Sequence, residues 1–190
     1  MYLFLVPLLI GFFFNWASAF TGFYVRWLGE TSGQAVSFLL RNILGIPVWA
    51  AGLVMACRIS TAPLFPASAF AAVLGWLLIG AGALLILWAL ALLGWRSFRP
   101  TSSDTLISRG IYRRIRHPIH SGVLLELFGL ALLFPTAPVM LACLLGYAYV
   151  VIQSRLEEAD LISRMPAYRD YMERVPRFLP RIGNHPSARE

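Results

Sequence analysis

The sequence contains no lysine, and only 13% of its 190 residues carry a charge. A soluble domain usually has about 25% charged residues, so this chain has too few to cover a surface that faces water. Hydrophobic residues make up 58% of the composition, and the mean hydropathy is +0.69. These values exclude an ordinary soluble domain and indicate an integral membrane protein whose apolar segments face lipid.

Cysteine is also scarce. Cys57 and Cys143 lie in apolar stretches far apart in the sequence. Their spacing predicts neither a disulfide framework nor a cysteine-based metal site. We therefore expect two small buried side chains and no bound metal.

Apolar segments divide the chain and predict an all-α fold, a polytopic membrane helical bundle of about five transmembrane helices. The last two segments are short compared with the roughly 20 residues of a full span. A tight turn joins them, which favours a crossing helical hairpin over a re-entrant one. Within the second segment, Pro47 is expected to kink the helix or to cap a broken one. The segments are residues 2–20, 35–57, 67–95, 119–134 and 139–152.

The arginines are distributed unevenly between the two sides of the predicted bundle. With five crossings, Arg58 is the single arginine on the side of the N-terminus, and the other 15 of the 16 lie opposite. Arginine is in excess in cytoplasmic loops, so we expect an external N-terminus and a cytoplasmic C-terminus, in a bacterial inner membrane. The arginines flank apolar segments instead of lining a polar face, and we therefore expect no nucleic-acid partner.

The polar loop 96–118 and the tail after residue 153 are expected at the same membrane face. Pro118 suits the first turn of a helix, so His117 should lie at a helix entry beside free backbone N–H groups. Glu157 and Glu158 are adjacent carboxylates at the end of an apolar segment. They predict either ion pairs with nearby arginines or recognition of a ligand's ammonium or hydroxyl groups.

The fourth apolar segment contains two further ionisable residues. Glu126 lies in its interior, where an ionisable group is a candidate functional residue unless it is simply protonated or paired inside the bundle. His120 lies near its start and is a candidate general base or substrate contact. The alternative is that His120 is an interfacial side chain without a catalytic role.

The order and spacing of three motifs resemble a known family. The motifs are residues 108–118 (SRGIYRRIRHP), the Glu157–Glu158 pair and residues 168–180 (YRDYMERVPRFLP). Together they resemble the isoprenylcysteine carboxyl methyltransferase family and its relatives, the membrane phospholipid methyltransferases. The resemblance covers about residues 97–181. It implies N-terminal transmembrane helices over residues 1–95 and a catalytic region over residues 96–190.

The resemblance implies an S-adenosylmethionine-dependent methyltransferase. Its cofactor pocket would lie at the cytoplasmic membrane face, in the C-terminal region, and the tail would close it. We also predict that His120, Glu126 and Arg155 are catalytic. The residues expected to bind the cofactor are Asp104, Thr105, Leu106, Ile107, Tyr112, His117, Pro118 and Glu157.

Three departures from the family pattern concern the methyl acceptor. His120 replaces the usual tyrosine, Met165-Pro166 replaces a phenylalanine and glycine, and Gln153 replaces an arginine that contacts the substrate. They argue against prenylcysteine and leave a lipidic or small apolar acceptor with a carboxylate, amine or thiol. Two alternatives remain, a non-catalytic membrane binding protein and a nicotinamide-dependent enzyme similar to sterol reductases. Ile119 counts against the reductase, which typically has asparagine there.

Overall fold

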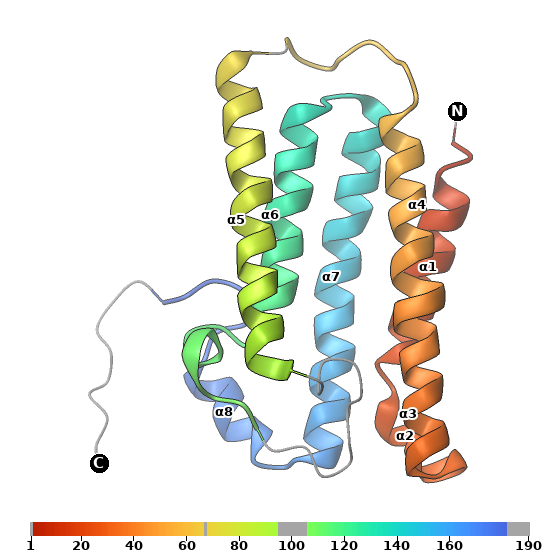
Figure 1. Cartoon of the computed structure of the whole chain (residues 1–190), viewed down its shortest axis with the longest axis vertical. Helices are drawn as coiled ribbons and strands as arrows, with labels where there is room; N and C mark the ends of the chain where they lie inside the picture. Colours follow the sequence, from red (N-terminus) through yellow and green to blue (C-terminus); the bar gives the residue numbers. More distant parts are fainter. Residues whose placement is uncertain (1, 67, 95–105, 182–190) are drawn as a thin grey trace.

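The structure is a computed structural model that describes residues 2–66, 68–94 and 106–181. These residues are mainly helical (Figure 1), apart from loops and one isolated bridge between Pro63 and Thr136, which confirms the predicted all-α class. In chain order the elements are α1 (Leu5–Ser18), α2 (Thr21–Leu28), α3 (Glu30–Phe38), the π-helix η1 (Leu39–Gly45), α4 (Ile46–Cys57), α5 (Ala69–Leu93), the 3-10 helix η3 (Gly110–Arg113), α6 (Pro118–Leu133), α7 (Ala137–Arg164) and α8 (Tyr168–Arg174).

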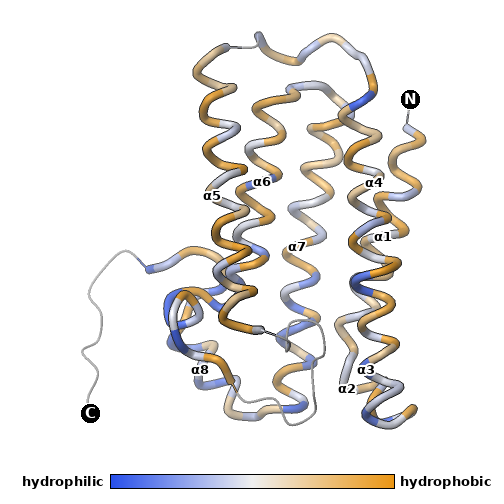
Figure 2. The backbone as a smooth tube through the Cα atoms, in the orientation of Figure 1, coloured by the Kyte–Doolittle hydropathy of each residue, from blue (hydrophilic) through white to orange (hydrophobic). Residues whose placement is uncertain are grey.

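The long helices form an antiparallel bundle with two chemically different ends. The N-terminus, the loop after α4 and the turn between α6 and α7 lie at one end, whereas α2, η3 and α8 lie at the other (Figure 1). The N–H of Leu64 donates to the carbonyl of Pro135 at 2.7 Å, which ties the loop to the turn. Hydrophilic residues gather around α8 and the end of α7 (Figure 2). We call this the polar end of the bundle.

Three helical stretches are long and apolar enough to cross a membrane: Glu30–Cys57, Ala69–Leu93 and Ala137–Arg164. The bent pair α1 and α2, with an angle of 62°, qualifies as a fourth when taken as one span. The remaining predicted crossing, the fourth segment, corresponds to α6, which is apolar but has only 16 residues. Length and composition therefore support three or four spans and a shorter helix packed beside them.

The structure gives more detail for two of the predicted segments. The fifth segment was expected to end near Ile152, but α7 continues to Arg164 and has 28 residues. The continuation keeps Glu157 and Glu158 on a regular helix, where they pair with neighbouring side chains. Pro47 occupies the first turn of α4, directly after an irregular stretch of helix, which fits the expected cap of a broken helix. The irregular backbone is the π-helix directly before it.

The main core lies between α1, α4, α6 and α7. Phe12 of α1 stacks on Tyr149 of α7 with ring centroids 4.2 Å apart. Both cysteines are free, as predicted; Cys143 is buried and Cys57 is partly buried. Other buried members of this core are Phe4, Leu8, Ala56, Leu127, Ala131, Val139, Ala142 and Val150.

Helices α5 and α6 pack through glycines that face one another. A Cβ atom at Gly129 would lie 2.5 Å from the carbonyl oxygen of Gly75, and one at Gly122 would lie 2.6 Å from that of Gly82. Such spacing lets two helix backbones approach closely, a common device between membrane helices. The proposed boundary between residues 95 and 96 stays a prediction, and the helices on its two sides are in close contact.

Candidate functional site

The polar end of the bundle brings together side chains from the start of α6 and the later part of α7. Pro118 opens α6, as predicted, and His117 is its N-cap residue. His117 Nδ1 lies 3.7 Å from Glu157 Oε2 and 3.3 Å from His120 Nδ1. The distance from His120 Nδ1 to Glu157 Oε2 is 3.9 Å. The structure thus confirms that the motif around His117 and the glutamate pair meet after one helical hairpin.

Glu158, the neighbour of Glu157, is buried and paired with three side chains of the site. Its side chain is 4% exposed and accepts hydrogen bonds from Arg116 Nε at 3.0 Å and from Arg177 Nη2 at 2.5 Å. His117 Nε2 lies 3.0 Å from the same carboxylate. A buried carboxylate with this many partners has a structural role, so Glu157 is the residue of the pair that remains suited to a ligand.

The C-terminal tail lies against the entry to α6. The backbone N–H groups of Arg116 and His117 donate to the carbonyls of Pro176 and Arg177, at 2.9 and 3.0 Å. The Arg116 guanidinium also donates to the carbonyls of Met172 and Val175. These hydrogen bonds fix α8 and the segment after it against the start of α6.

A cluster of tyrosines borders the site on the side of η3. The buried hydroxyl of Tyr171 donates to the carbonyl of Tyr112 at 2.5 Å. Burial raises the pKa of Tyr171 to about 12, and it raises the pKa of Tyr112 as well. Leu106 packs against the buried cluster of Tyr168, Tyr171 and Val175, and Ile107 is partly buried. Asp104 and Thr105, two more predicted cofactor residues, lie outside the described residues.

Replacing Tyr171 with phenylalanine tests this cluster. The variant keeps the ring and loses one buried hydrogen bond, so we expect a loss of about 0.5–1.5 kcal/mol in the free energy of unfolding. Because the pKa of Tyr171 is near 12, its hydroxyl remains a donor, and the loss should be constant between roughly pH 6 and 9. Denaturant unfolding in detergent micelles measures it. Tyr2→Phe, at an exposed position, is the control, and equal stability of Tyr171→Phe and wild type would contradict the assignment.

Two residues of the site were not predicted as ligands. Arg41 Nη2, from the π-helix η1, lies 3.8 Å from Glu157 Oε1, and Gln153 Nε2 donates to the same oxygen at 2.9 Å. Gln153 Oε1 is buried, with no hydrogen-bond partner among the described residues. An arginine within an apolar segment is itself a signal for function, and π-helical turns are frequent at functional sites. That signal could have identified Arg41.

Two predicted catalytic residues lie apart from this cluster. Arg155 is exposed on α7, and no described contact joins it to Glu157. Glu126 lies farther along α6 and faces α5, where a Cβ atom at Gly82 would meet its Cγ at 2.8 Å. The geometry therefore brings His120 to His117 and Glu157, two of the predicted cofactor residues, and leaves Arg155 and Glu126 outside this cluster.

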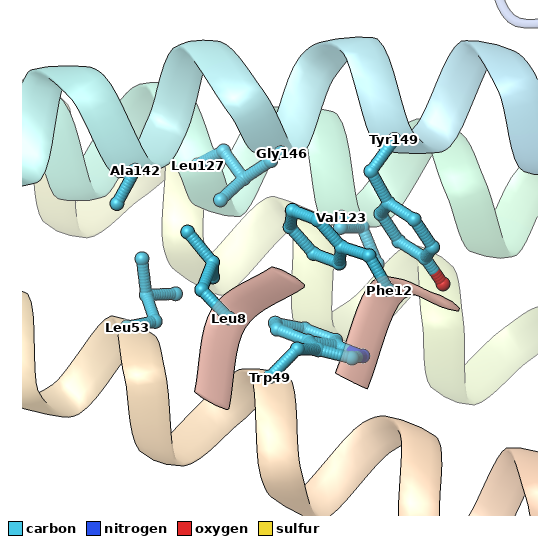
Figure 3. Close-up of a pocket in the computed structure, with 9 residues that line it drawn as sticks. All are labelled: Leu8, Phe12, Trp49, Leu53, Val123, Leu127, Ala142, Gly146 and Tyr149. Carbon is cyan, nitrogen blue, oxygen red and sulfur yellow. The ribbon is translucent and has the colours of Figure 1, made fainter. Parts of the chain in front are cut away.

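A small apolar pocket opens in the core between α1, α4, α6 and α7 (Figure 3). The Tyr149 hydroxyl lies at the end of the pocket opposite Leu53, toward the later residues of α7 (Figure 3). Gln153 follows Tyr149 by one helical turn and Glu157 follows by two, about 12 Å along the helix. The pocket is therefore separated from Glu157 by about two helical turns of α7. It is lined by Leu8, Phe12, Trp49, Leu53, Val123, Leu127, Ala142, Gly146 and Tyr149.

Two curated proteins are similar to part of the chain. Methanethiol S-methyltransferase 2 of Bradyrhizobium diazoefficiens is 37% identical over 73 residues, which are 38% of this chain and 27% of that protein. The cobalt-zinc-cadmium resistance protein CzcN of Cupriavidus metallidurans is 36% identical over 84 residues, 42% of this chain and 38% of that protein. The chain thus spans between about a quarter and two fifths of the length of these relatives. No solved structure matches it.

A family profile extends the similarity over about half of the chain. The profile of the family described as phospholipid methyltransferase matches residues 70–165, from the start of α5 to the end of α7. This range includes His117, His120 and both glutamates of the site. It confirms the resemblance to membrane methyltransferases that the motifs indicated. The chain belongs to the phospholipid methyltransferase family.

Proposed function

We propose that the protein is an S-adenosylmethionine-dependent methyltransferase whose cofactor binds at the polar end of the bundle. The observation that carries this proposal is the position of Glu157. Its carboxylate lies between His117, His120, Arg41 and Gln153, within the region matched by the family. We further propose that this end faces the cytoplasm of a bacterium, because the cofactor is water-soluble and the arginines are concentrated there.

The residues present suit the charges of the cofactor. S-adenosylmethionine carries an ammonium, a carboxylate and a sulfonium that supplies an electrophilic methyl group. Glu157 and the unpartnered Oε1 of Gln153 can accept hydrogen bonds from the ammonium. Arg41 can bind the carboxylate. Leu106, Ile107, Tyr112, His117 and Pro118 are the other residues that we propose for this pocket, with Asp104 and Thr105 beyond the described part.

The chain would contribute alignment and exclusion of water more than covalent chemistry. Holding two reactants in line can supply roughly 7–11 kcal/mol of the barrier. Glu158 and its arginines keep the tail closed over the site, and the packed helices exclude water from the other side. His120, 3.3 Å from His117, is placed to take a proton from an acceptor that arrives neutral.

The acceptor that we propose is a small or lipidic apolar molecule that enters from the membrane. The side chains around the core pocket are almost entirely hydrocarbon, which favours an apolar acceptor over a polar one. The relative named for methanethiol suggests a thiol as the first acceptor to test. A thiolate is already charged and nucleophilic, so it requires only orientation beside the methyl donor.

Binding of S-adenosylhomocysteine tests the cofactor site. Isothermal titration of the purified protein in detergent should give one site per chain. Glu157→Gln should weaken binding roughly 10- to 100-fold, because it removes a charged hydrogen-bond acceptor. Glu173→Gln alters an exposed glutamate of the tail and should bind like wild type. Absence of binding to wild type, or equal binding by Glu157→Gln, would refute the proposed site.

A further inference from the structure

Three potential metal ligands meet at the polar end of the bundle. His117, His120 and Glu157 each offer one atom, and these atoms lie within 4.8 Å of one another. The sequence predicted no bound metal because that expectation rested on the spacing of the cysteines. Two histidines and a glutamate that a helical hairpin brings together leave no trace in cysteine spacing. We propose that His117 Nδ1, His120 Nδ1 and Glu157 Oε2 bind a divalent transition-metal ion of the zinc class.

The distances between these atoms match a coordination sphere. They are 3.3 Å between the two nitrogens, 3.7 Å from His117 to Glu157 and 3.9 Å from His120 to Glu157. The point equidistant from the three atoms lies roughly 2.1 Å from each, which is the bond length of Zn²⁺ to imidazole nitrogen or carboxylate oxygen. The ion would therefore fit with side-chain adjustments of a few tenths of an ångström.

The surrounding hydrogen bonds orient the ligands as metal sites require. A histidine that binds a metal through one nitrogen usually donates its other N–H to a carboxylate. His117 Nε2 lies 3.0 Å from Glu158, so a proton there would leave Nδ1 available to the ion. Glu158 is itself held by Arg116 and Arg177. The His117 ligand is thus oriented by Glu158, which Arg116 and Arg177 hold in place.

The remaining charges are compatible with a cation. Arg41 and Gln153 both engage Glu157 Oε1, and the ion would bind the other oxygen, Oε2. Two imidazoles and one carboxylate favour Zn²⁺ or a neighbouring transition metal over Mg²⁺ and Ca²⁺, which prefer oxygen ligands. Three protein ligands also leave a fourth tetrahedral position for water or a substrate atom such as a thiolate.

This proposal goes beyond the methyltransferase function and does not depend on it. His117 and Glu157 serve both the ion and the proposed cofactor, whereas the second nitrogen ligand comes from His120. A change at His120 therefore separates the two sites. His120→Phe removes the ligand atom and keeps an aromatic ring of similar size.

The test is titration of the chelator-treated full-length protein in detergent with Zn²⁺, followed by calorimetry and metal analysis. Wild type should bind one ion per chain. His120→Phe and Glu157→Gln should each weaken binding by more than about 100-fold, because loss even of an outer partner costs roughly 10- to 100-fold. Co²⁺ in place of zinc should give visible absorption bands of a tetrahedral site in wild type, and these bands should be absent from His120→Phe.

The controls test whether Zn²⁺ binds through the three proposed ligands or through other side chains. Glu173→Gln and Cys57→Ser should bind Zn²⁺ like wild type, which excludes a surface carboxylate and a thiolate as the source. Binding of S-adenosylhomocysteine by His120→Phe would show that this variant is folded. If the variant does not bind it, X-ray absorption of zinc-loaded wild type tests the site instead, by counting the imidazole ligands of the ion. No stoichiometric binding by wild type, binding that survives both ligand variants, or a spectrum without imidazole would overturn the proposal.

Discussion

Glu158→Ala is expected to destabilise the protein by about 3–5 kcal/mol, because it removes one partner of a buried ion pair. Arg116, whose side chain is 8% exposed, would keep its charge without a carboxylate. Arg177 and His117 would also lose the group that holds the tail over α6. Unfolding by denaturant in detergent micelles, followed by circular dichroism, measures the loss.

A double variant tests whether the loss of stability comes from leaving the Arg116 charge buried without a partner. Glu158→Leu combined with Arg116→Met removes both charges, so it should be more stable than Glu158→Ala alone. The recovery should be partial, since the carbonyls of Met172 and Val175 lose their donor. Glu158→Ala with a stability within about 1 kcal/mol of wild type would show that this carboxylate does not anchor the site.

Gly129→Ala is expected to destabilise the contact between α5 and α6 by about 1–3 kcal/mol, the usual cost of overpacking. The new Cβ atom would lie 2.5 Å from the carbonyl oxygen of Gly75, and backbone cannot move aside as a flexible side chain can. The helices would have to separate, which would also move the start of α6 and with it His117. Thermal unfolding in the same detergent measures the loss.

Gly80→Ala is the matched control for this prediction. Gly80 lies in the same pair of helices, and a Cβ atom there would meet nothing within 4 Å. Alanine is favoured over glycine in a helix by up to about 1 kcal/mol, so this variant should equal or exceed wild type in stability. If both alanine variants behave alike, the close approach of the two backbones is not important for stability.

Much of the fold could be predicted from composition and periodicity. The apolar segments match α1, α5 and α6 to within three residues at each end, since lipid requires long uninterrupted apolar stretches, whereas α2 and the start of α3 lie outside them. Residues 156–165 have helical character in the sequence, but their continuity with the apolar part of α7 could not be predicted, because the last residues of α7 are polar and have partners elsewhere. Asp160 has such a partner: it accepts a hydrogen bond from the N–H of Gly22 at 2.9 Å, far away in the sequence.

The site was partly predictable for a related reason. A hairpin brings its two ends together, so the proximity of His117 and Glu157 follows from topology. Adjacent residues on a helix point about 100° apart, however, and the rotation of α7 decides which glutamate faces Arg116 and which faces His120. Arg41 reaches the site from the N-terminal half through the packing of η1 against α1, and no motif spacing contains that information.

The most direct test of the central claim is transfer of a labelled methyl group. Purified protein is incubated with S-adenosylmethionine labelled in its methyl group, together with a small alkanethiol or with a membrane extract. We predict a labelled apolar product from wild type and from Glu173→Gln, and little or none from Glu157→Gln. Absence of a labelled product from wild type with every acceptor, or equal product from Glu157→Gln, would contradict a methyltransferase site at this end of the bundle.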